Sequence, residues 1–302
     1  ILTNSNEKQS MQQYIEFKKQ RELGEILSDT FGFIRGQFKT FFGTILKIVG
    51  PYLLVMLISL GFYYYFIGDM FSFSVQTSNE FFNPIMMILV FIIFFLAIIA
   101  AYVMAQATVL FYIKSYANNK GVINFEEIKK NVYTHFWSFI GLGLLVGMSI
   151  MVGFIFCIIP GIYLYPILAL SFSVMVFNQK GVSEAYGYSF TLIKDNWWIT
   201  FITFFVIGII VGIASYAFSI PAYIYMMVKM GTMAGETDPV ALTGGIFDPI
   251  YILLNLLSVS VQFLLNIITL VAGVLIYFNL NEKKNFTGTY ERIDNLGKSS
   301  EG

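Results

Sequence analysis

The sequence predicts an all-α polytopic membrane protein with six transmembrane helices, arranged as three hairpins that are each preceded by an amphipathic interfacial helix. Two observations predict this fold. Of the 302 residues, 57% are hydrophobic and only 12% are charged, whereas a soluble domain has about 25% charged residues. Several apolar runs also reach the roughly 20 residues that a helix needs to cross a bilayer.

Six apolar runs define the predicted spans, at residues 43–66, 84–117, 139–159, 162–178, 198–220 and 249–280. The third and fourth are joined only by Pro160-Gly161, a pair that breaks a helix and favours a tight turn. The fourth span is short, whereas the second and sixth are long enough to tilt or protrude from the bilayer. Pro221 is expected to kink or end the fifth helix.

The charge distribution predicts the orientation of these spans. With six crossings, the N-terminus, the connections 118–138 and 179–197 and the C-terminal tail share one side, which carries every Lys and Arg except Lys229, 17 of 18. Because cytoplasmic loops are enriched in Lys and Arg, we expect both termini in the cytoplasm, at a bacterial inner (cytoplasmic) membrane. The predicted organisation is a polar N-terminus at 1–21, one membrane domain at 22–281 and a cytoplasmic tail at 282–302.

Each hairpin follows a segment with the pattern of an amphipathic helix. In the segment 182–198, apolar residues recur at helical spacing, with Glu184 and Lys194 off that row. Such a helix is expected among the lipid headgroups, with Trp197 and Trp198 at the boundary where tryptophan is favoured. A cytoplasmic helix packed on another subunit is the alternative. The predicted interfacial anchors of the three segments are Leu27, Phe31, Ile34, Phe38, Val132, His135, Tyr186, Phe190, Ile193, Trp197 and Trp198.

These amphipathic segments predict an internal repeat. The apolar row near the N-terminus precedes the row of 182–198 by 159 residues at every position, and Glu25 then matches Glu184. A weaker copy begins at Ile128, with Glu126 in the place of Glu184. We therefore expect three parallel repeats, at 22–117, 120–178 and 180–280.

The run PGIYLYPILALSFSVMVFNQKGVSEAYGYSFTLIKDNWW, from Pro160 to Trp198, resembles the membrane domain of the glycerophosphodiester phosphodiesterase type. That domain is attached to some bacterial phosphodiesterases and also occurs alone. The resemblance covers roughly residues 20–295 and implies a stand-alone bacterial member without the catalytic barrel, hence without its activity. Relatives in Bacteroidota lie near genes for AAA+ ATPases and small membrane proteins, which implies other membrane-protein subunits as partners, including an AAA+ ATPase-linked system.

No catalytic, cofactor-binding or metal-binding residue is predicted. His135 is the only histidine, and the chain has no HExxH, GxSxG or phosphate-loop motif. No charged residue lies deep in a predicted span, which disfavours both ion-coupled transport and an intramembrane enzyme. The net charge is zero, which disfavours a nucleic-acid partner.

The sixth span carries a polar row at helical spacing, formed by Asn255, Ser258, Gln262, Asn266 and Thr269. An unpaired amide is costly in hydrocarbon, so this face is expected to point inward. One interpretation is hydrogen bonding between helices, and the other is a hydrated groove or a docking face for another subunit.

Small residues also recur at the spacing of close helix contacts. Packing inside the bundle is the first interpretation and oligomerisation the second. The residues are Ala97, Ala101 and Ala105 in the second span, Gly143 and Gly147 in the third, and Gly208, Gly212 and Ser215 in the fifth.

The sequence favours a non-enzymatic integral inner-membrane protein that serves as a subunit or scaffold of a multi-protein bacterial membrane complex. The alternative is a carrier or scramblase-like protein for a lipid or a small neutral solute, which would use the polar row of the sixth span.

Overall fold

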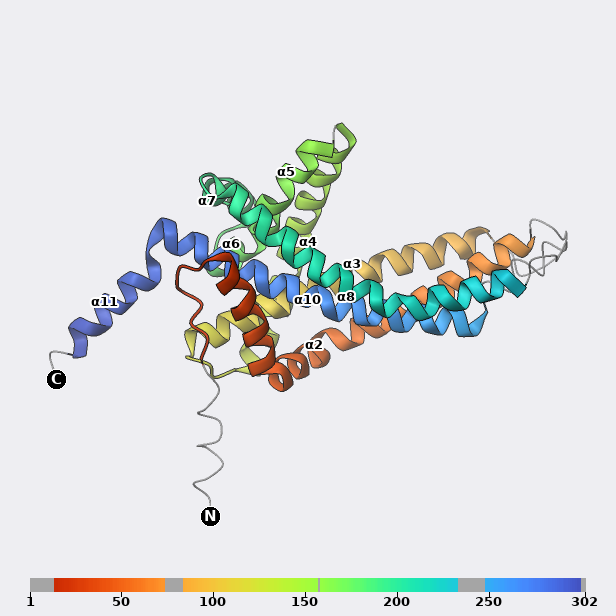
Figure 1. The fold of residues 1–302 in the computed structure, drawn as a ribbon, viewed down its shortest axis with the longest axis horizontal. Coiled ribbons are helices and arrows are strands. Elements are labelled where there is room, and N and C mark those ends of the chain that lie inside the picture. Colours follow the sequence, from red (N-terminus) through yellow and green to blue (C-terminus); the bar gives the residue numbers. More distant parts are fainter. Residues whose placement is uncertain (1–13, 74–83, 157, 233–247, 300–302) are drawn as a thin grey trace, which may run out of the picture. The chain divides into compact units, whose positions relative to one another are not determined.

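The computed structural model describes residues 14–73, 84–156, 158–232 and 248–299. Every regular element within these ranges is a helix (Figure 1). The helices are α2 (Leu23–Phe73), α3 (Pro84–Asn118), α4 (Phe125–Phe156), α5 (Ile158–Ala169), α6 (Ser171–Phe177), α7 (Val182–Ile193), α8 (Trp197–Thr232), α10 (Pro249–Asn285) and α11 (Thr287–Ser299).

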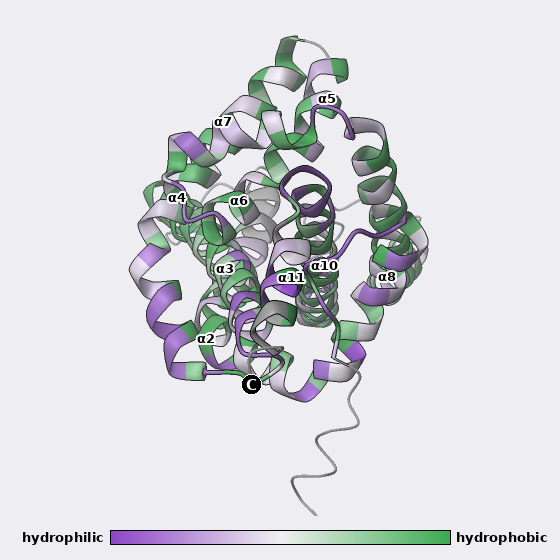
Figure 2. Ribbon diagram, turned by 90° about the vertical axis from the view of Figure 1, so that its left-hand side faces the viewer, coloured by the Kyte–Doolittle hydropathy of each residue, from purple (hydrophilic) through white to green (hydrophobic). Residues whose placement is uncertain are grey.

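Six stretches of helix are long and apolar enough to cross a membrane: they lie in α2, α3, α4, α5 with α6, α8 and α10. Hydrophobic residues cover most of these helices, whereas α11 is mainly hydrophilic (Figure 2). The chain is therefore an all-α polytopic membrane protein, which confirms the predicted fold class.

Two of the predicted interfacial helices are continuous with the spans that follow them. The first is the beginning of α2, and the second is the beginning of α4. Only α7 is a separate helix, because the chain turns at Lys194-Asp195 before α8 begins, and the Asn196 N–H donates to the Ile193 carbonyl at 2.8 Å. The carbonyl of Asn196 accepts the backbone N–H of Thr200 at 3.1 Å, so Asn196 starts α8, as asparagine often does at a helix N-terminus.

The turn between the third and fourth spans differs from the prediction. Pro160 and Gly161 lie inside the first turn of α5, where proline is tolerated because its missing N–H has no helical partner. Gly161 instead serves close packing: a Cβ there would lie 2.7 Å from the ring of Phe154, and one at Gly153 would lie 3.1 Å from the Gly161 Cα. The fourth span is also interrupted at Leu170, between α5 and α6.

Pro221 does not end the fifth helix. Helix α8 runs through it to Thr232, and α2 likewise contains Pro51. Proline inside a membrane helix is tolerated because neighbouring groups satisfy the carbonyl that loses its donor.

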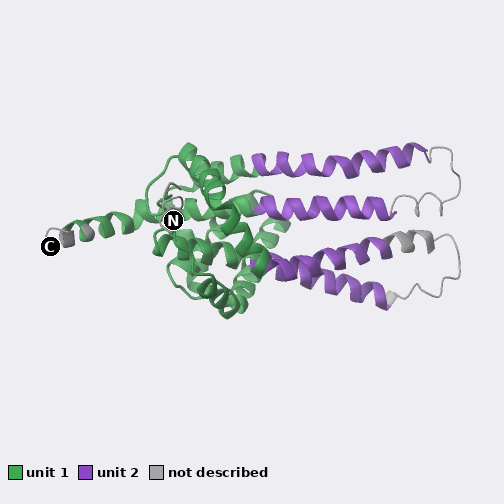
Figure 3. Cartoon of the chain, turned by 90° about the horizontal axis from the view of Figure 1, so that it is seen from below, with its two compact units in different colours: residues 1–48, 105–208, 267–302 green, residues 49–104, 209–266 purple. Residues whose placement is uncertain are grey.

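The chain divides into two compact units (Figure 3). Unit 2 consists of residues 49–104 and 209–266, which belong to α2, α3, α8 and α10. Unit 1 consists of residues 1–48, 105–208 and 267–302, and it includes all of α4 to α7 and α11. The middle one of the three predicted repeats therefore contributes nothing to unit 2.

The predicted repeat has counterparts in the backbone. Within the described residues, three non-glycine residues have a positive φ, and each directly follows an asparagine where the last helix of one predicted repeat ends: Lys120 (φ 48°), Gln179 (φ 53°) and Phe286 (φ 51°). A left-handed residue commonly ends a helix. Buried residues also recur 159 positions apart, as in Thr30 and Ser189 or Ile48 and Ile207. The repeat stays a prediction, which these regularities support.

The tip of the α4–α5 hairpin lies beside the start of α8. The rings of Tyr163 and Trp197 are stacked at 5.2 Å, and the indole N–H of Trp197 donates to the Tyr163 carbonyl at 3.0 Å. The predicted topology, by contrast, puts the Pro160-Gly161 turn and Trp197 on opposite sides of the membrane, and it stays a prediction. The charge pattern could not reveal the difference, because a hairpin returns the chain to the side from which it started.

This contact predicts the reactivity of engineered thiols. With the native Cys157 replaced by alanine, we expect Ile159→Cys and Lys283→Cys to react with a membrane-impermeant thiol reagent from the same side, because Ile159 and Lys283 line one pocket. Asp69→Cys, in the connection between the first two predicted spans, which the charge distribution places on the other side, is the control. Labelling of Ile159→Cys together with Asp69→Cys, and not with Lys283→Cys, would contradict the structure.

Candidate functional site

Two buried residues, Phe17 and Arg21, hold the segment before α2 on unit 1. Phe17 is only 1% exposed, and its ring meets the rings of Phe33 and Phe278 edge-on at 5.3 and 5.6 Å. These contacts join the N-terminal segment to α2 and α10. Aromatic pairs of this kind add about 0.5–1.5 kcal/mol each beyond the burial of their surface.

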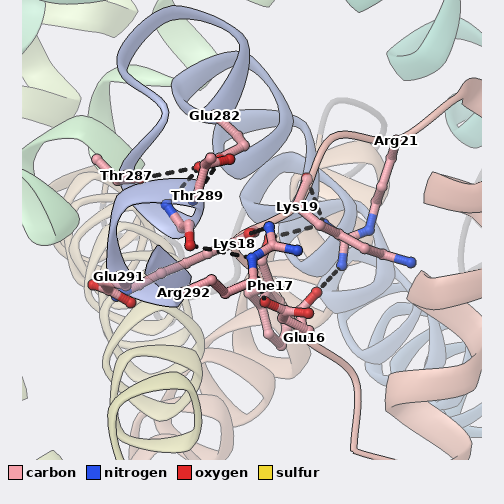
Figure 4. Close-up of polar contacts among 11 residues, drawn as sticks. Glu16, Phe17, Lys18, Lys19, Arg21, Glu282, Thr287, Thr289, Glu291 and Arg292 are labelled. Carbon is pink, nitrogen blue, oxygen red and sulfur yellow. Dashed lines mark hydrogen bonds and ion pairs between the residues drawn. The ribbon is translucent and has the colours of Figure 1, made fainter. Parts of the chain in front are cut away.

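Arg21 fixes the end of this segment (Figure 4). Its side chain is buried, and its guanidinium donates to Asp29 Oδ2 at 2.8 Å and to the Phe17 carbonyl at 2.8 Å. Its backbone N–H donates to Asn279 Oδ1 on α10 at 2.8 Å. Burial lowers the pKa of the Arg21 guanidinium, and Asp29 opposes that shift. A buried arginine is tolerated here because its donors meet acceptors.

Glu282 joins α10 to α11 (Figure 4). It is 2% exposed. Its carboxylate accepts the backbone N–H groups of Gly288 and Thr289, at 2.7 and 2.9 Å, and the hydroxyls of Thr289 and Thr287, at 2.7 and 3.3 Å. The first N–H groups of a helix lack helical acceptors, and a negative charge is favoured there. Glu282 therefore anchors the start of α11.

Close packing holds the same turn of α11 against the N-terminal segment. A Cβ at Gly288 would overlap the carbonyl of Lys18, so only glycine fits there without a shift. Lys18 forms an ion pair with Glu291, and the guanidinium of Arg292 donates to the Lys18 carbonyl at 3.3 Å. The first turns of α11 are thus fixed on one side.

The other side of α11 carries exposed apolar side chains. Tyr290 and Ile293 are 66% and 60% exposed, and residues three apart are neighbours on a helix surface. We call these two residues the α11 apolar face. Because α11 lies beyond the apolar run of α10 and is itself hydrophilic, lipid tails do not explain this exposure (Figure 2). The arrangement suits the docking of another protein.

The predicted polar row of α10 is placed mainly for packing. Ser258 is 5% exposed and donates to the Phe218 carbonyl of α8 at 2.9 Å, and the Gln262 amide donates to Ser219 Oγ of α8 at 3.0 Å. Asn255 and Asn266 donate within α10, to the carbonyls of Tyr251 and Gln262. Thr269 is half-buried. Two members of the row therefore link α10 to α8.

Most predicted anchors of α2 and α7 lie beside the face that is buried inside unit 1, whereas Ile193 belongs to that face. In α2 the buried residues are Ile26, Thr30 and Phe33, whereas Phe31 and Phe38 are 37% and 61% exposed and Leu27 and Ile34 are half-buried. In α7 they are Ala185, Ser189, Leu192 and the predicted Ile193, whereas Tyr186 and Phe190 are half-buried. At the start of α8, Trp197 is half-buried and Trp198 is exposed. Thr30 and Ser189 make the buried face hard to recognise in the sequence, because they are polar residues within it. Each can be buried because its hydroxyl donates to a carbonyl of its own helix.

In α4 the predicted row separates into two environments. Val132 is fully buried, whereas His135 is exposed. Nδ1 of His135 lies 2.9 Å from the Asn131 carbonyl, and its ring lies 5.2 Å from that of Phe111. His135 therefore lies at the surface of α4, against Phe111.

The predicted small residues differ in their surroundings. Ala97, Ala101 and Ala105 are buried, and Gly143 lies against Phe172. Other described residues leave the space above Gly147, Gly208 and Gly212 open, and Ser215 is half-buried. The close backbone approach is instead that of Gly153 and Gly161, which the sequence analysis did not single out.

Within the described residues, no group of three or more His, Cys, Asp or Glu side chains could hold a metal ion. No family model, curated protein or solved structure matches the chain. The resemblance to the glycerophosphodiester phosphodiesterase membrane domain therefore stays a prediction.

The role of Glu282 predicts a local loss of stability. Glu282→Gln keeps one acceptor oxygen and removes the other, so at least one buried donor at the start of α11 loses its partner, which costs about 1–3 kcal/mol. Faster hydrogen exchange of the Gly288 and Thr289 amides would report this loss. Glu291→Gln is the matched control, because the Glu291 side chain is 57% exposed and a surface ion pair contributes about 0–1 kcal/mol. Equal exchange in both variants would contradict the anchoring role.

Proposed function

We propose that the protein is a non-enzymatic integral subunit or scaffold of a multi-protein complex in the bacterial inner membrane, with both termini in the cytoplasm. The observation that carries the proposal is α11: its start is anchored by buried Glu282, and its apolar face remains exposed. The positive-inside distribution of Lys and Arg supports the cytoplasmic side.

The geometry of α11 is suited to recognition. An anchored helix loses little conformational entropy when a partner binds, so more of the contact energy appears as affinity. Burying the side chain of Ile293 would contribute about 1.5–3 kcal/mol, and tyrosine is enriched among interface residues that dominate binding. The polar residues around this face keep α11 in water until the partner arrives.

Site-specific photo-cross-linking in the native membrane tests this role. A photoreactive amino acid at Ile293 is expected to form a discrete adduct with one partner, and the same group at the exposed Lys130 of α4 is the control. Ile293→Ser in the full chain is expected to remove that partner from gently purified protein, because it deletes apolar surface without touching the Glu282 contacts. Purification of the native protein without a stable partner would overturn the proposal.

The carrier alternative makes a different demand on α10. A solute pathway needs the polar row to face open space, yet Ser258 is buried and Gln262 is bonded to α8. We therefore expect the native chain in reconstituted vesicles to show no solute uptake or lipid scrambling above that of protein-free vesicles. Gln262→Leu combined with Asn266→Leu should give the same result. Activity above that background in the native protein, abolished by the double substitution, would favour the carrier.

A further inference from the structure

A cavity of about 950 Å³ opens in unit 1 between the start of α5, the connection from α7 to α8 and the end of α10. Its volume lies within the range of roughly 300–1,000 Å³ that is typical of small-molecule sites. The sequence analysis predicted Trp197 and Trp198 as interfacial anchors, but it did not predict a cavity between them and α5.

One wall of the cavity is aromatic. The ring of Trp197 stacks on Tyr163 at 5.2 Å and on Phe201 at 5.1 Å, and Trp198 meets Trp197 edge-on at 4.8 Å. The hydrogen bond from the Trp197 indole to the Tyr163 carbonyl fixes this wall. Trp198 is 71% exposed, so a large apolar surface is available to a ligand.

The lining of the cavity also carries charge. Lys194, Asp195 and Lys283 line it. Neither ammonium group forms a hydrogen bond or an ion pair with another residue that the structure describes, although Lys283 is half-buried. The neighbouring Lys284, by contrast, donates to the Thr191 carbonyl at 2.7 Å. Because two ammonium groups and one carboxylate line the cavity, its net charge is positive, which favours an anionic ligand.

We propose that this cavity binds a phospholipid with an anionic headgroup. Its phosphate pairs with Lys194 and Lys283, and the upper parts of its acyl chains lie against the wall of Tyr163, Trp197 and Trp198. The site assigns a ligand to a surface that the docking role of α11 does not use, so the proposal stands independently of the proposed function.

The place of the cavity along the chain supports a lipid. Lys194 lies three residues before the apolar run of α8 begins at Trp197, and Lys283 lies three residues after that of α10 ends at Leu280. Both helices therefore leave hydrocarbon at this level, where tryptophan is favoured and where basic residues meet anionic headgroups. Free inorganic phosphate would satisfy the lysines but would leave the aromatic wall without a contact.

The tryptophans of the site provide the test. The chain has three tryptophans, and Trp137→Phe leaves only Trp197 and Trp198 as reporters. The full-length Trp137→Phe protein is reconstituted in phosphatidylcholine vesicles that contain phosphatidylglycerol or phosphatidylcholine with brominated acyl chains, at equal mole fraction. Bromine quenches tryptophan only at contact, so we expect stronger quenching by the anionic lipid.

A charge-matched pair of variants isolates the site. Lys194→Gln with Lys283→Gln is expected to lower the preference for the anionic lipid by about tenfold or more, the order expected for two lost lysine contacts. Lys129→Gln with Lys130→Gln removes the same charge from exposed positions of α4 and should keep the preference. An unchanged size-exclusion profile verifies folding, and each single lysine variant should give an intermediate value.

Three outcomes would overturn the proposal. Equal quenching by both brominated lipids would show that the site has no anionic preference. An equal loss in the two double variants would assign the preference to overall charge. If added inorganic phosphate changed the fluorescence and abolished quenching by the anionic lipid, the site would be assigned to free phosphate.

Discussion

Unit 1 depends on one constraint: the buried polar and charged side chains at the end of α10 must find hydrogen-bond partners. Asn279, Asn281 and Glu282 are all at most 5% exposed, directly after a long apolar run of the same helix. An unpaired carboxylate in such a place would be prohibitively costly. The N-terminal segment and the start of α11 supply the missing donors, so both must lie against α10. Chain ends that look like polar tails in the sequence are thereby parts of the folded structure.

The lengths of the three hairpins explain how unit 1 acquires its cavity. The helices α2, α3, α8 and α10 all extend into unit 2, whereas the hairpin of α4 with α5 and α6 ends within unit 1. Its tip is therefore free to meet the start of α8, where Tyr163 stacks on Trp197. If the three repeats share an ancestor, the cavity arises because the middle one is short. The Gly153–Gly161 contact makes so tight a hairpin possible, since no Cβ separates the two backbones.

Hydropathy alone predicted the fold class, because a run of some twenty apolar residues has few alternatives to a membrane helix. The finer features depend on contacts between residues far apart in the sequence. Arg21 bonds to Asn279, 258 positions away, and no local pattern indicates such a pair. The buried faces of α2 and α7 lie beside the predicted apolar rows, and they include hydroxyl groups because a hydroxyl can be buried when it bonds to its own helix backbone, as Thr30 does at 2.6 Å. The break before α8 was more accessible, since Asp195-Asn196 is a typical turn and cap sequence.

The end of α10 serves two different surfaces through consecutive residues. Successive side chains on a helix point about 100° apart, since a turn takes about 3.6 residues. Glu282 therefore reaches the start of α11 while Lys283 lines the aromatic cavity. Because both positions belong to one rigid turn, a rotation or a shift of that turn cannot move one without the other. The anchoring of α11 thus also holds Lys283 in place, and an anionic headgroup at Lys283 would in turn favour the orientation of α10 in which Glu282 caps α11. The interaction that orders the C-terminal end of the chain is for this reason coupled to the occupancy of the aromatic cavity.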